Sequence, residues 1–413
     1  MTTAIDTQTN TMNRQIGKEK AGQRKRKGTA KKNVPTPACD EEPLKFSSDS
    51  EDSDVSKCSS SATVIDHACK EDFQKEGYTN PLNMIKFAPL NVPMHRRRET
   101  LAHVINASLL VGSQILFLLA FLFPFMWPIL IAYLVYMCFD QTPETGGRKW
   151  EWMRRLTLWK WYADYFPARL IAEAPLDPER NYIFGYHPHG IISMGVFSNF
   201  ITEATGVSGI FPGLSIKVLT LIQNFNFPIY REYLLSMGLA SVSRNSIAHI
   251  LGSGPGKSCL IVVGGAEESL EAKPNSAKLV LAHRYGFVRM AIICGADLVP
   301  VFGFGENQLY DQIENSAGSW TRAIQTRIKH TFGSTLPLFY GRGIFTYNFG
   351  LLPHRQPLTV ITGAPIRIEQ NSNPSQEMVQ AVHKQYLEAL TDLYNRNKKA
   401  YWTGSEAPKL TFI

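Results

Sequence analysis

The 413-residue chain lacks several patterns that mark common classes of protein. Its six cysteines are scattered, with no Cys-x-x-Cys pair, so a disulfide framework is excluded and reduced cytosolic thiols are expected. No His-Glu-x-x-His pair occurs either, and no metal is predicted. The first residues include no apolar run of the kind that forms a secretory signal, so none is expected.

Three near matches to catalytic motifs also fall short. Gly252–Ser258 resembles a phosphate loop, but it is one residue short and precedes a predicted strand instead of following one. In Gly190–Gly195 the serine is one position away from that of a hydrolase nucleophile elbow. Phe302–Glu306 lacks the third glycine of a dinucleotide fingerprint. Nucleotide hydrolysis and serine hydrolysis are therefore not favoured.

Charge is scarce and predominantly positive. Charged residues make up 19% of the chain, below the usual ~25%, and the net charge is +8. A basic protein favours anionic partners such as acidic lipid, phosphorylated substrates or nucleic acid. The balance fits a globular body with one membrane-embedded piece.

Residues 1–78 have few large apolar side chains, so a disordered N-terminal tail is predicted. The basic cluster Lys18–Lys32 resembles a nuclear-localisation signal or a nucleic-acid arm. The apolar span that follows instead favours attraction to an anionic membrane surface or no function at all, and no nucleic-acid partner is predicted.

A span of 36 residues, Val104–Phe139, contains no Asp, Glu, Lys or Arg. It is too long for one membrane helix of ~20 residues, and Pro124 and Pro128 would break it near its middle. Basic residues flank both ends, so the positive-inside rule predicts a membrane hairpin within residues 79–145. A buried helical pair in a soluble core is the alternative. The next segment, Trp150–Arg169, mixes aromatic residues with cations and is predicted to lie at the lipid headgroups.

Residues 146–413 alternate apolar runs with helical patterns, which predicts a single α/β domain with a sheet flanked by helices. The predicted strands are Tyr182–Tyr186, Cys259–Val263, Asp297–Phe302, Leu336–Tyr340 and Leu358–Gly363. The predicted helices are Ile192–Thr202, Arg231–Leu239, Ser246–Leu251, Lys278–Cys294, Trp320–His330 and Gln376–Lys399.

The stretch Asn181–Gly190, NYIFGYHPHG, places two histidines at the end of the first of these strands. The carboxyl ends of strands are where α/β sheets usually carry their chemistry, and imidazole is the default general base near pH 7. Catalysis by His187 or His189 is therefore favoured, and Gly190 lets a ligand approach the backbone closely. A purely structural histidine pair and a His-x-His metal site are the alternatives.

The His-Pro-His-Gly block resembles the diacylglycerol acyltransferase type 2 family, which includes monoacylglycerol and wax-alcohol acyltransferases. The likeness extends from about Arg98 to Lys399. The other matching blocks, in order, are Tyr165-Phe166-Pro167, Pro228-x-x-Arg231-Glu232-Tyr233, Gly264–Ser269, Gly286–Pro300, Phe304–Asn307 and Gly341-Arg342-Gly343.

The resemblance implies an O-acyltransferase that moves an acyl group from acyl-CoA to diacylglycerol and yields triacylglycerol. Acyl-CoA would be a co-substrate, and no cofactor is implied. The implied location is the endoplasmic reticulum membrane and the lipid-droplet surface, with the catalytic domain in the cytosol; a homo-oligomer is compatible. Monoacylglycerol or a long-chain alcohol is the alternative acceptor. Rival classes are a non-enzymatic droplet hairpin protein and a lipid esterase.

A carboxylate beside a histidine orients the ring and stabilises the imidazolium. Glu268 matches the glutamate of the family's Gly-Gly-x-x-Glu block, so we expect it to partner His189, the preferred base, with His187 orienting its neighbour. The Asp found five residues after the histidine in other glycerolipid acyltransferases is absent, since Ile192 and Met194 stand there. Backbone N–H groups near Gly190 or Gly265 would hold the oxyanion.

The remaining predicted site residues bind substrate. Arginine suits the phosphates of coenzyme A, because its planar guanidinium donates two parallel hydrogen bonds. The predicted substrate-binding residues, besides Gly190, are Tyr165, Phe166, Pro167, Arg231, Glu232, Gly264, Gly265, Arg284, Arg289 and Arg342.

Overall fold

The computed structural model describes residues 86–89, 91–312, 339–404 and 406–413. The chain divides into two units, Met1–Gly77 and Tyr78–Ile413, and every described residue belongs to the second. The predicted disordered tail, its basic cluster and the predicted helix Trp320–His330 lie outside the described residues. Most of the predicted strand Leu336–Tyr340 does so as well.

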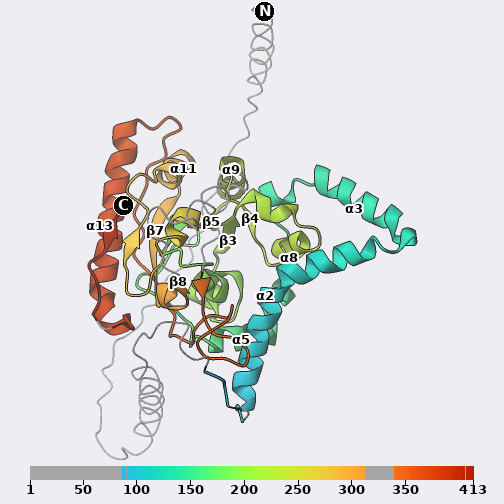
Figure 1. The fold of residues 1–413 in the computed structure, drawn as a ribbon. Helices are drawn as coiled ribbons and strands as arrows, with labels where there is room; N and C mark the ends of the chain where they lie inside the picture. The colour runs from blue at the N-terminus through green and yellow to red at the C-terminus, as the bar shows by residue number, and fades with distance from the viewer. Residues whose placement is uncertain (1–85, 90, 313–338, 405) are drawn as a thin grey trace, which may run out of the picture. The chain divides into compact units, whose positions relative to one another are not determined.

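A seven-stranded sheet forms the centre of the second unit (Figure 1). Its order is β1-β10-β7-β2-β5-β3-β4, and β2 lies in the middle, parallel to both β5 and β7. All six residues of β2 are buried, as an uncharged strand in a sheet covered on both faces should be. The strands are β1 Arg169–Ala172, β2 Tyr182–His187, β3 Ser215–Thr220, β4 Ala240–Ser241, β5 Lys257–Val262, β7 Asp297–Phe304 and β10 Thr359–Thr362.

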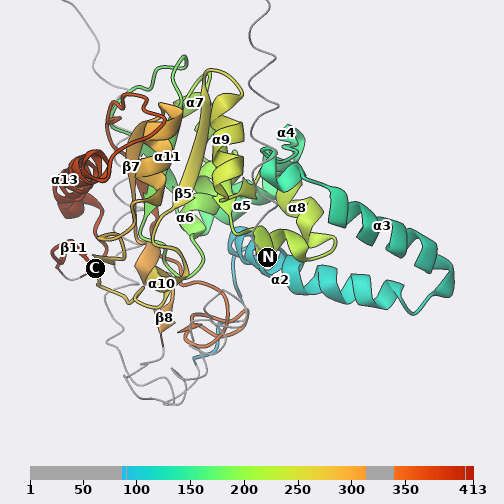
Figure 2. The same cartoon turned by 90° about the horizontal axis from the view of Figure 1, so that it is seen from above.

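Helices cover both faces of this sheet, which confirms the predicted α/β class. Three helices, α9 Arg244–Gly252, α11 Gly286–Cys294 and α13 Gln376–Tyr401, pack on one face (Figure 2). The opposite face packs against the aromatic residues of α5 and the helical turns after β2. Outside the apolar span and the turn after it, the other described helices are α4 Glu151–Arg154, α5 Thr157–Asp164, α6 Met194–Val196, η4 Phe197–Ile201, α7 Val207–Ile210, η5 Ile222–Asn226, α8 Tyr230–Ser236, α10 Gly265–Ser269 and η6 Glu306–Gln308.

The apolar span forms a helical hairpin, as predicted. It consists of α2 Met94–Ala120, η2 Pro124–Met126 and α3 Trp127–Phe139, followed by η3 Thr142–Glu144. The chain reverses where the two prolines prevent a continuous helix. Two helical stretches, Met94–Ala120 and Pro124–Glu144, are long and apolar enough to cross a membrane, and little of either is buried inside the protein. Both views show the hairpin on the side of the sheet away from α13 (Figures 1 and 2).

Two polar residues of α2 contact the body of the protein. Asn106 accepts a hydrogen bond from the hydroxyl of Tyr233, and Gln114 donates one to the carbonyl of Pro228. The root of the hairpin is fastened by the ion pair of Glu99 with Arg355. The apolar span therefore has a polar stripe, which sequence reasoning missed.

Several predicted boundaries need correction. Lys278–Cys294 is not one helix: Lys278–Leu279 form β6, which pairs with β11 Thr411–Phe412, and the helix begins only at Gly286. Three strands of the central sheet, β1, β3 and β4, were not predicted. A further two-stranded sheet pairs β8 Asp311–Gln312 with β9 Phe339–Tyr340.

The aromatic segment Trp150–Arg169 also differs from its prediction as an interfacial element. Trp159, Tyr162 and Phe166 are buried in the core, while Trp150 and Trp152 are exposed. One face of this short helical segment thus anchors the hairpin to the sheet, and its exposed tryptophans lie at its start.

Candidate active site

His187 is the last residue of β2, and its ring lies buried beside α13. The hydroxyl of Tyr386 donates to the carbonyl of Gly185 at 3.0 Å, so it can only accept from His187 Nε2, which lies 3.0 Å away. The proton of His187 is therefore on Nε2, and its Nδ1 is a buried lone pair with no partner among the residues that the structure describes. Burial lowers the pKa of His187 to about 3. A neutral ring enclosed in this way is a structural group.

His189 has the opposite character. Its side chain is partly exposed just beyond the strand, and Nδ1 lies 3.1 Å from the carbonyl oxygen of Gly190. A carbonyl only accepts, so Nδ1 must carry the proton and Nε2 keeps a lone pair. No partner for Nε2 is found among the described residues. Burial lowers the pKa of His189, while the bond to Gly190 opposes the shift. The ring is thus neutral near pH 7, as a general base must be.

Glu268 lies next to His189, but its carboxylate makes no hydrogen bond to the ring. Its Oε1 accepts the backbone N–H of His189 at 2.5 Å, and its Oε2 accepts the N–H of Val280 at 2.8 Å. The predicted pair is therefore brought together in a different way, since the carboxylate fixes the backbone that carries the imidazole. A side chain at Gly264 would collide with this carboxylate, which explains the glycine there.

A second buried carboxylate, Glu306, holds the same loop from the other end. Its two oxygens accept the N–H groups of Met194 at 2.7 Å and Gly195 at 2.9 Å, and Oε2 also accepts the hydroxyl of Tyr186 at 2.6 Å. Gly190 lies so close that a Cβ there would come within 2.6 Å of Glu306 Cγ. Sequence reasoning assigned no role to Glu306, although it lies in the family-like block Phe304–Asn307.

Burial raises the pKa of both carboxyl groups to about 7. The hydrogen bonds that each accepts act in the opposite direction, because they stabilise the carboxylate. Two poorly solvated acids thus flank the loop that presents His189.

The predicted glycines belong to this arrangement. Gly190 and Gly265 both adopt positive φ, +58° and +59°, which favours glycine. A Cβ at Gly265 would meet nothing within 4 Å, so the backbone there faces open space. The structure therefore gathers Gly190, Gly264 and Gly265 around His189 and Glu268.

The predicted arginines make different contacts. Arg284 lies near the site, where its guanidinium contacts Glu267 at 2.5 Å and acts on the pKa of Glu268. Arg289 instead donates to the side chain of Gln376. Arg342 stacks over the ring of Tyr347.

Arg231 and Glu232 serve the hairpin, because both contact the residues that follow or form α3. Arg231 is buried and pairs with Asp140, and it also donates to the carbonyls of Met137 and Asp140. Its charge is already matched, so the geometry does not favour the predicted phosphate role.

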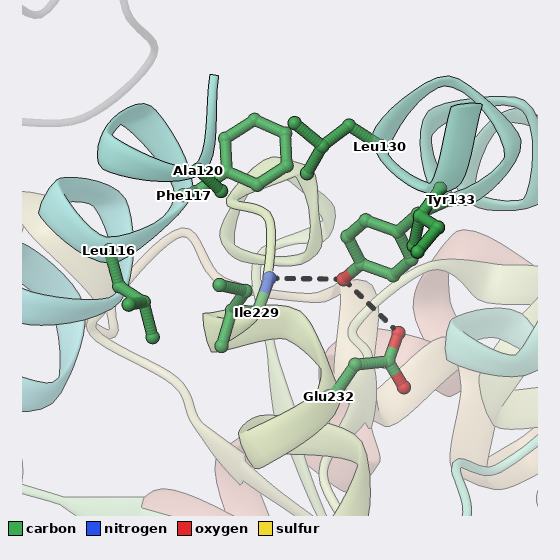
Figure 3. A pocket seen from close by; sticks show the side chains of 8 residues that line it. Leu116, Phe117, Ala120, Leu130, Tyr133, Ile229 and Glu232 are labelled. Atoms are coloured by element: carbon green, nitrogen blue, oxygen red, sulfur yellow. Dashed lines mark hydrogen bonds between the residues drawn. The ribbon is translucent and has the colours of Figure 1, made fainter. Parts of the chain in front are cut away.

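Glu232 lines an apolar crevice of about 280 Å³ between α2, α3 and α8 (Figure 3). The hydroxyl of Tyr133 lies at its polar end, 3.0 Å from the N–H of Ile229 and 3.5 Å from Glu232. The other lining residues are Leu116, Phe117, Ala120, Ile129 and Leu130.

The Tyr165-Phe166-Pro167 block joins α5 to the sheet. Tyr165 donates to the carbonyl of Pro353 at 2.6 Å, and the carbonyl of Phe166 accepts from Leu358 at 3.0 Å. These contacts are structural. In the described part of the chain, no group of three or more His, Cys, Asp or Glu side chains could hold a metal ion.

A family model described as diacylglycerol acyltransferase matches residues 119–411. The chain belongs to the diacylglycerol acyltransferase family. It is 48% identical to diacylglycerol O-acyltransferase 2A of Umbelopsis ramanniana, over 76% of this chain and 90% of that protein. It is 46% identical to diacylglycerol O-acyltransferase 2 of Dictyostelium discoideum, over 77% and 96%, and 44% identical to 2-acylglycerol O-acyltransferase 1 of Bos taurus, over the same shares.

Membership of this family makes the chain an O-acyltransferase enzyme, as the His-Pro-His-Gly block and its companions predicted. Among solved structures, a 1-acyl-sn-glycerophosphate acyltransferase of Thermotoga maritima is 12% identical with a TM-score of 0.32, over 72% of this chain and 99% of that one. A likeness this weak supports no conclusion about the site.

Proposed function

We propose that this enzyme transfers a fatty acyl group from acyl-CoA to the free hydroxyl of diacylglycerol and so makes triacylglycerol. The observation that carries the proposal is His189, a neutral imidazole whose Nε2 lone pair has no partner among the described residues. The names of the relatives support diacylglycerol as the acceptor.

In the reaction, His189 Nε2 takes the proton of the acceptor hydroxyl while the hydroxyl oxygen attacks the thioester carbonyl carbon. The tetrahedral intermediate then collapses: the C–S bond breaks, the ester remains, and the imidazolium returns the proton to the leaving thiolate. A positioned base of this kind contributes ~10²–10⁴-fold in rate. His187 takes no part, because its remaining lone pair is buried.

The negative charge of the intermediate needs hydrogen-bond donors. The N–H groups of Gly190, Ile191 and Ile192 follow the base directly, and none has an acceptor among the residues that the structure describes. One such donor contributes about 10²–10³ in rate. We assign a phosphate of coenzyme A to Arg284, because its guanidinium is exposed and close enough to Glu268 to act on the pKa of that carboxyl group.

The hairpin would hold this site at a membrane. Two apolar helices with arginines at both ends support insertion from the cytosolic side. We assign this membrane to the endoplasmic reticulum and the droplet surface. A fat-soluble alcohol and a water-soluble thioester can meet there.

One observation favours a second acceptor, since 2-acylglycerol O-acyltransferases are nearly as similar as the diacylglycerol enzymes. Purified full-length protein in vesicles, given labelled acyl-CoA with diacylglycerol, monoacylglycerol or a long-chain alcohol in parallel, separates these cases. We expect triacylglycerol to form fastest. A higher rate on monoacylglycerol or alcohol would overturn the acceptor, and labelled free fatty acid as the main product would overturn transferase chemistry.

A further inference from the structure

The loop Gly341–Leu352 presents large apolar side chains to the outside of the protein. Phe345 is 75% exposed, Leu351 74% and Phe349 58%. Phe87, which precedes the hairpin, is 74% exposed, and it forms an antiparallel bridge with Thr346. We name Phe87 and the loop Gly341–Leu352 the apolar loop patch.

The backbone of this patch satisfies many of its own hydrogen bonds. Arg342 and Leu352 exchange two bonds of 2.8 Å, and Gly343 donates to the carbonyl of Thr346 at 2.9 Å. Two further bonds join the loop to the preceding segment, Tyr347 N–H to the Lys86 carbonyl and Ala88 N–H to the Phe345 carbonyl. Each of these bonds lowers the cost of moving the loop backbone from bulk water to a lipid surface.

The patch lies at the root of the hairpin. Residues 86–88, to which it is bonded, lead directly into α2, and both views show the orange loop beside this blue segment (Figures 1 and 2). Arg355, just beyond the loop, pairs with Glu99 of α2 and donates to the carbonyl of Arg96. The loop and the start of α2 are therefore one structural unit.

The charges beside the patch are predominantly positive, and the acid at the start of α2, Glu99, is already paired with Arg355. Gly341–Pro353 contains no Asp or Glu, and Arg96, Arg97 and Arg98 are exposed at the start of α2. Apolar and aromatic side chains beside a row of cations match the headgroup layer of an anionic lipid surface. A protein partner would have to present acidic side chains around the apolar loop patch.

We propose that the apolar loop patch is a second membrane contact, which inserts into the headgroup layer of an anionic bilayer or monolayer where the hairpin enters. This proposal rests on the membrane location given under the proposed function. Contact at two points, hairpin and loop, fixes the tilt of the enzyme on its surface, which insertion of the hairpin alone leaves free.

The test uses full-length protein with its six cysteines replaced by alanine and one cysteine added for an environment-sensitive fluorophore. The probe position is Phe345→Cys. Lys384→Cys, on the exposed side of α13, is the aqueous control, and Leu118→Cys, on α2, is the membrane control. The vesicles contain phosphatidylcholine with or without phosphatidylserine, and a lipid with a nitroxide quencher near its headgroup.

We expect the fluorophore at 345 to be quenched several-fold more strongly than the one at 384, and more strongly with phosphatidylserine present. Equal quenching at 345 and 384, with the label at 118 in lipid, overturns the proposal but leaves the membrane location intact. A label at 118 that remains in water overturns the membrane location itself. A fluorophore at 345 that reports an apolar environment in vesicles, but a watery one in nanodiscs holding one chain each, identifies a second copy of the chain as the occupant. This result also overturns the proposal.

A function readout completes the test. Phe345→Ser with Phe349→Ser should lower acyl transfer several-fold on acceptor presented in anionic vesicles, with an unchanged rate on acceptor dispersed in detergent. An equal loss in both conditions would indicate a folding defect and contradict the proposal.

Discussion

The variant Glu268→Gln tests whether the carboxylate of Glu268 fixes the backbone of His189 or orients its imidazole. The carboxylate accepts two backbone N–H groups, those of His189 and Val280. A glutamine offers one acceptor oxygen, so one buried N–H faces an NH₂ group instead. An unsatisfied buried donor costs about 1–3 kcal/mol, and the loop that presents His189 shifts.

The activity of Glu268→Gln follows from that shift. Misplacing a catalytic group by about 1 Å costs up to ~10²-fold in rate, so we expect a loss of this order together with a lower unfolding temperature. The exposed neighbour Glu267 provides an isosteric control, since its ion pair with Arg284 lies at the surface and is worth about 0–1 kcal/mol.

The pH dependence of Glu268→Gln is the sharpest readout. Activity should rise with pH through the pKa of His189, which lies below its usual value, and then level off. Burial and the Gly190 carbonyl set that pKa, and Glu268 makes no hydrogen bond to the ring, so the midpoint should be the same in the variant. A midpoint lowered by about one unit or more, or a ~10⁴-fold loss in a fully stable protein, would show that the carboxylate faces the imidazole and refute this reasoning.

Three further variants test neighbouring parts of the account. His187→Ala and His383→Ala, the latter on α13, should each destabilise the protein by about 2–5 kcal/mol. The activity per folded molecule should stay high in both variants. A stable but inactive His187→Ala protein would contradict this. Burial raises the pKa of Glu306 from about 4.5 to about 7, so between these pH values the folded state binds a proton that the unfolded state has lost. The free energy of unfolding should therefore fall as the pH rises from about 4.5 to about 7. Glu306→Gln should flatten this slope in thermal unfolding, and an unchanged slope would contradict the prediction. Arg231→Met should destabilise the protein by up to about 3–5 kcal/mol, because Asp140 loses its buried partner and keeps only the more exposed Arg148, at 3.8 Å. The KM for acyl-CoA should be unchanged, and a raised KM would restore the phosphate role.

The parts of the fold that could be predicted are those with strong, uninterrupted patterns. The uncharged run of β2, the glycine turn after β5 and the prolines in the apolar span each determine their local structure without help from distant residues. The edge strand β1 is only four residues long, and β3 has Lys217 in its middle, so neither shows the apolar run of a central strand. The polar stripe on α2 is recognisable only once α8 is packed against it.

The same distinction applies to the site. His189 and Glu268 could be predicted because the His-Pro-His-Gly and Gly-Gly-x-x-Glu blocks end predicted strands and match the family. The structure shows that these two strands are parallel neighbours. What could not be predicted is which atoms meet, because a carboxylate that accepts a backbone N–H leaves no sequence pattern different from one that faces a ring. Glu306 follows β7 and reaches the loop only through the fold, and Arg231 is committed to Asp140 for the same reason.

The base assigned to His189 is tested most directly by single-turnover transfer from labelled acyl-CoA to diacylglycerol in one batch of vesicles, with wild type beside His189→Gln. We expect the variant to form triacylglycerol ~10²–10⁴-fold more slowly, with an unchanged unfolding temperature and membrane content. Triacylglycerol formed by His189→Gln at the wild-type rate would contradict the assignment.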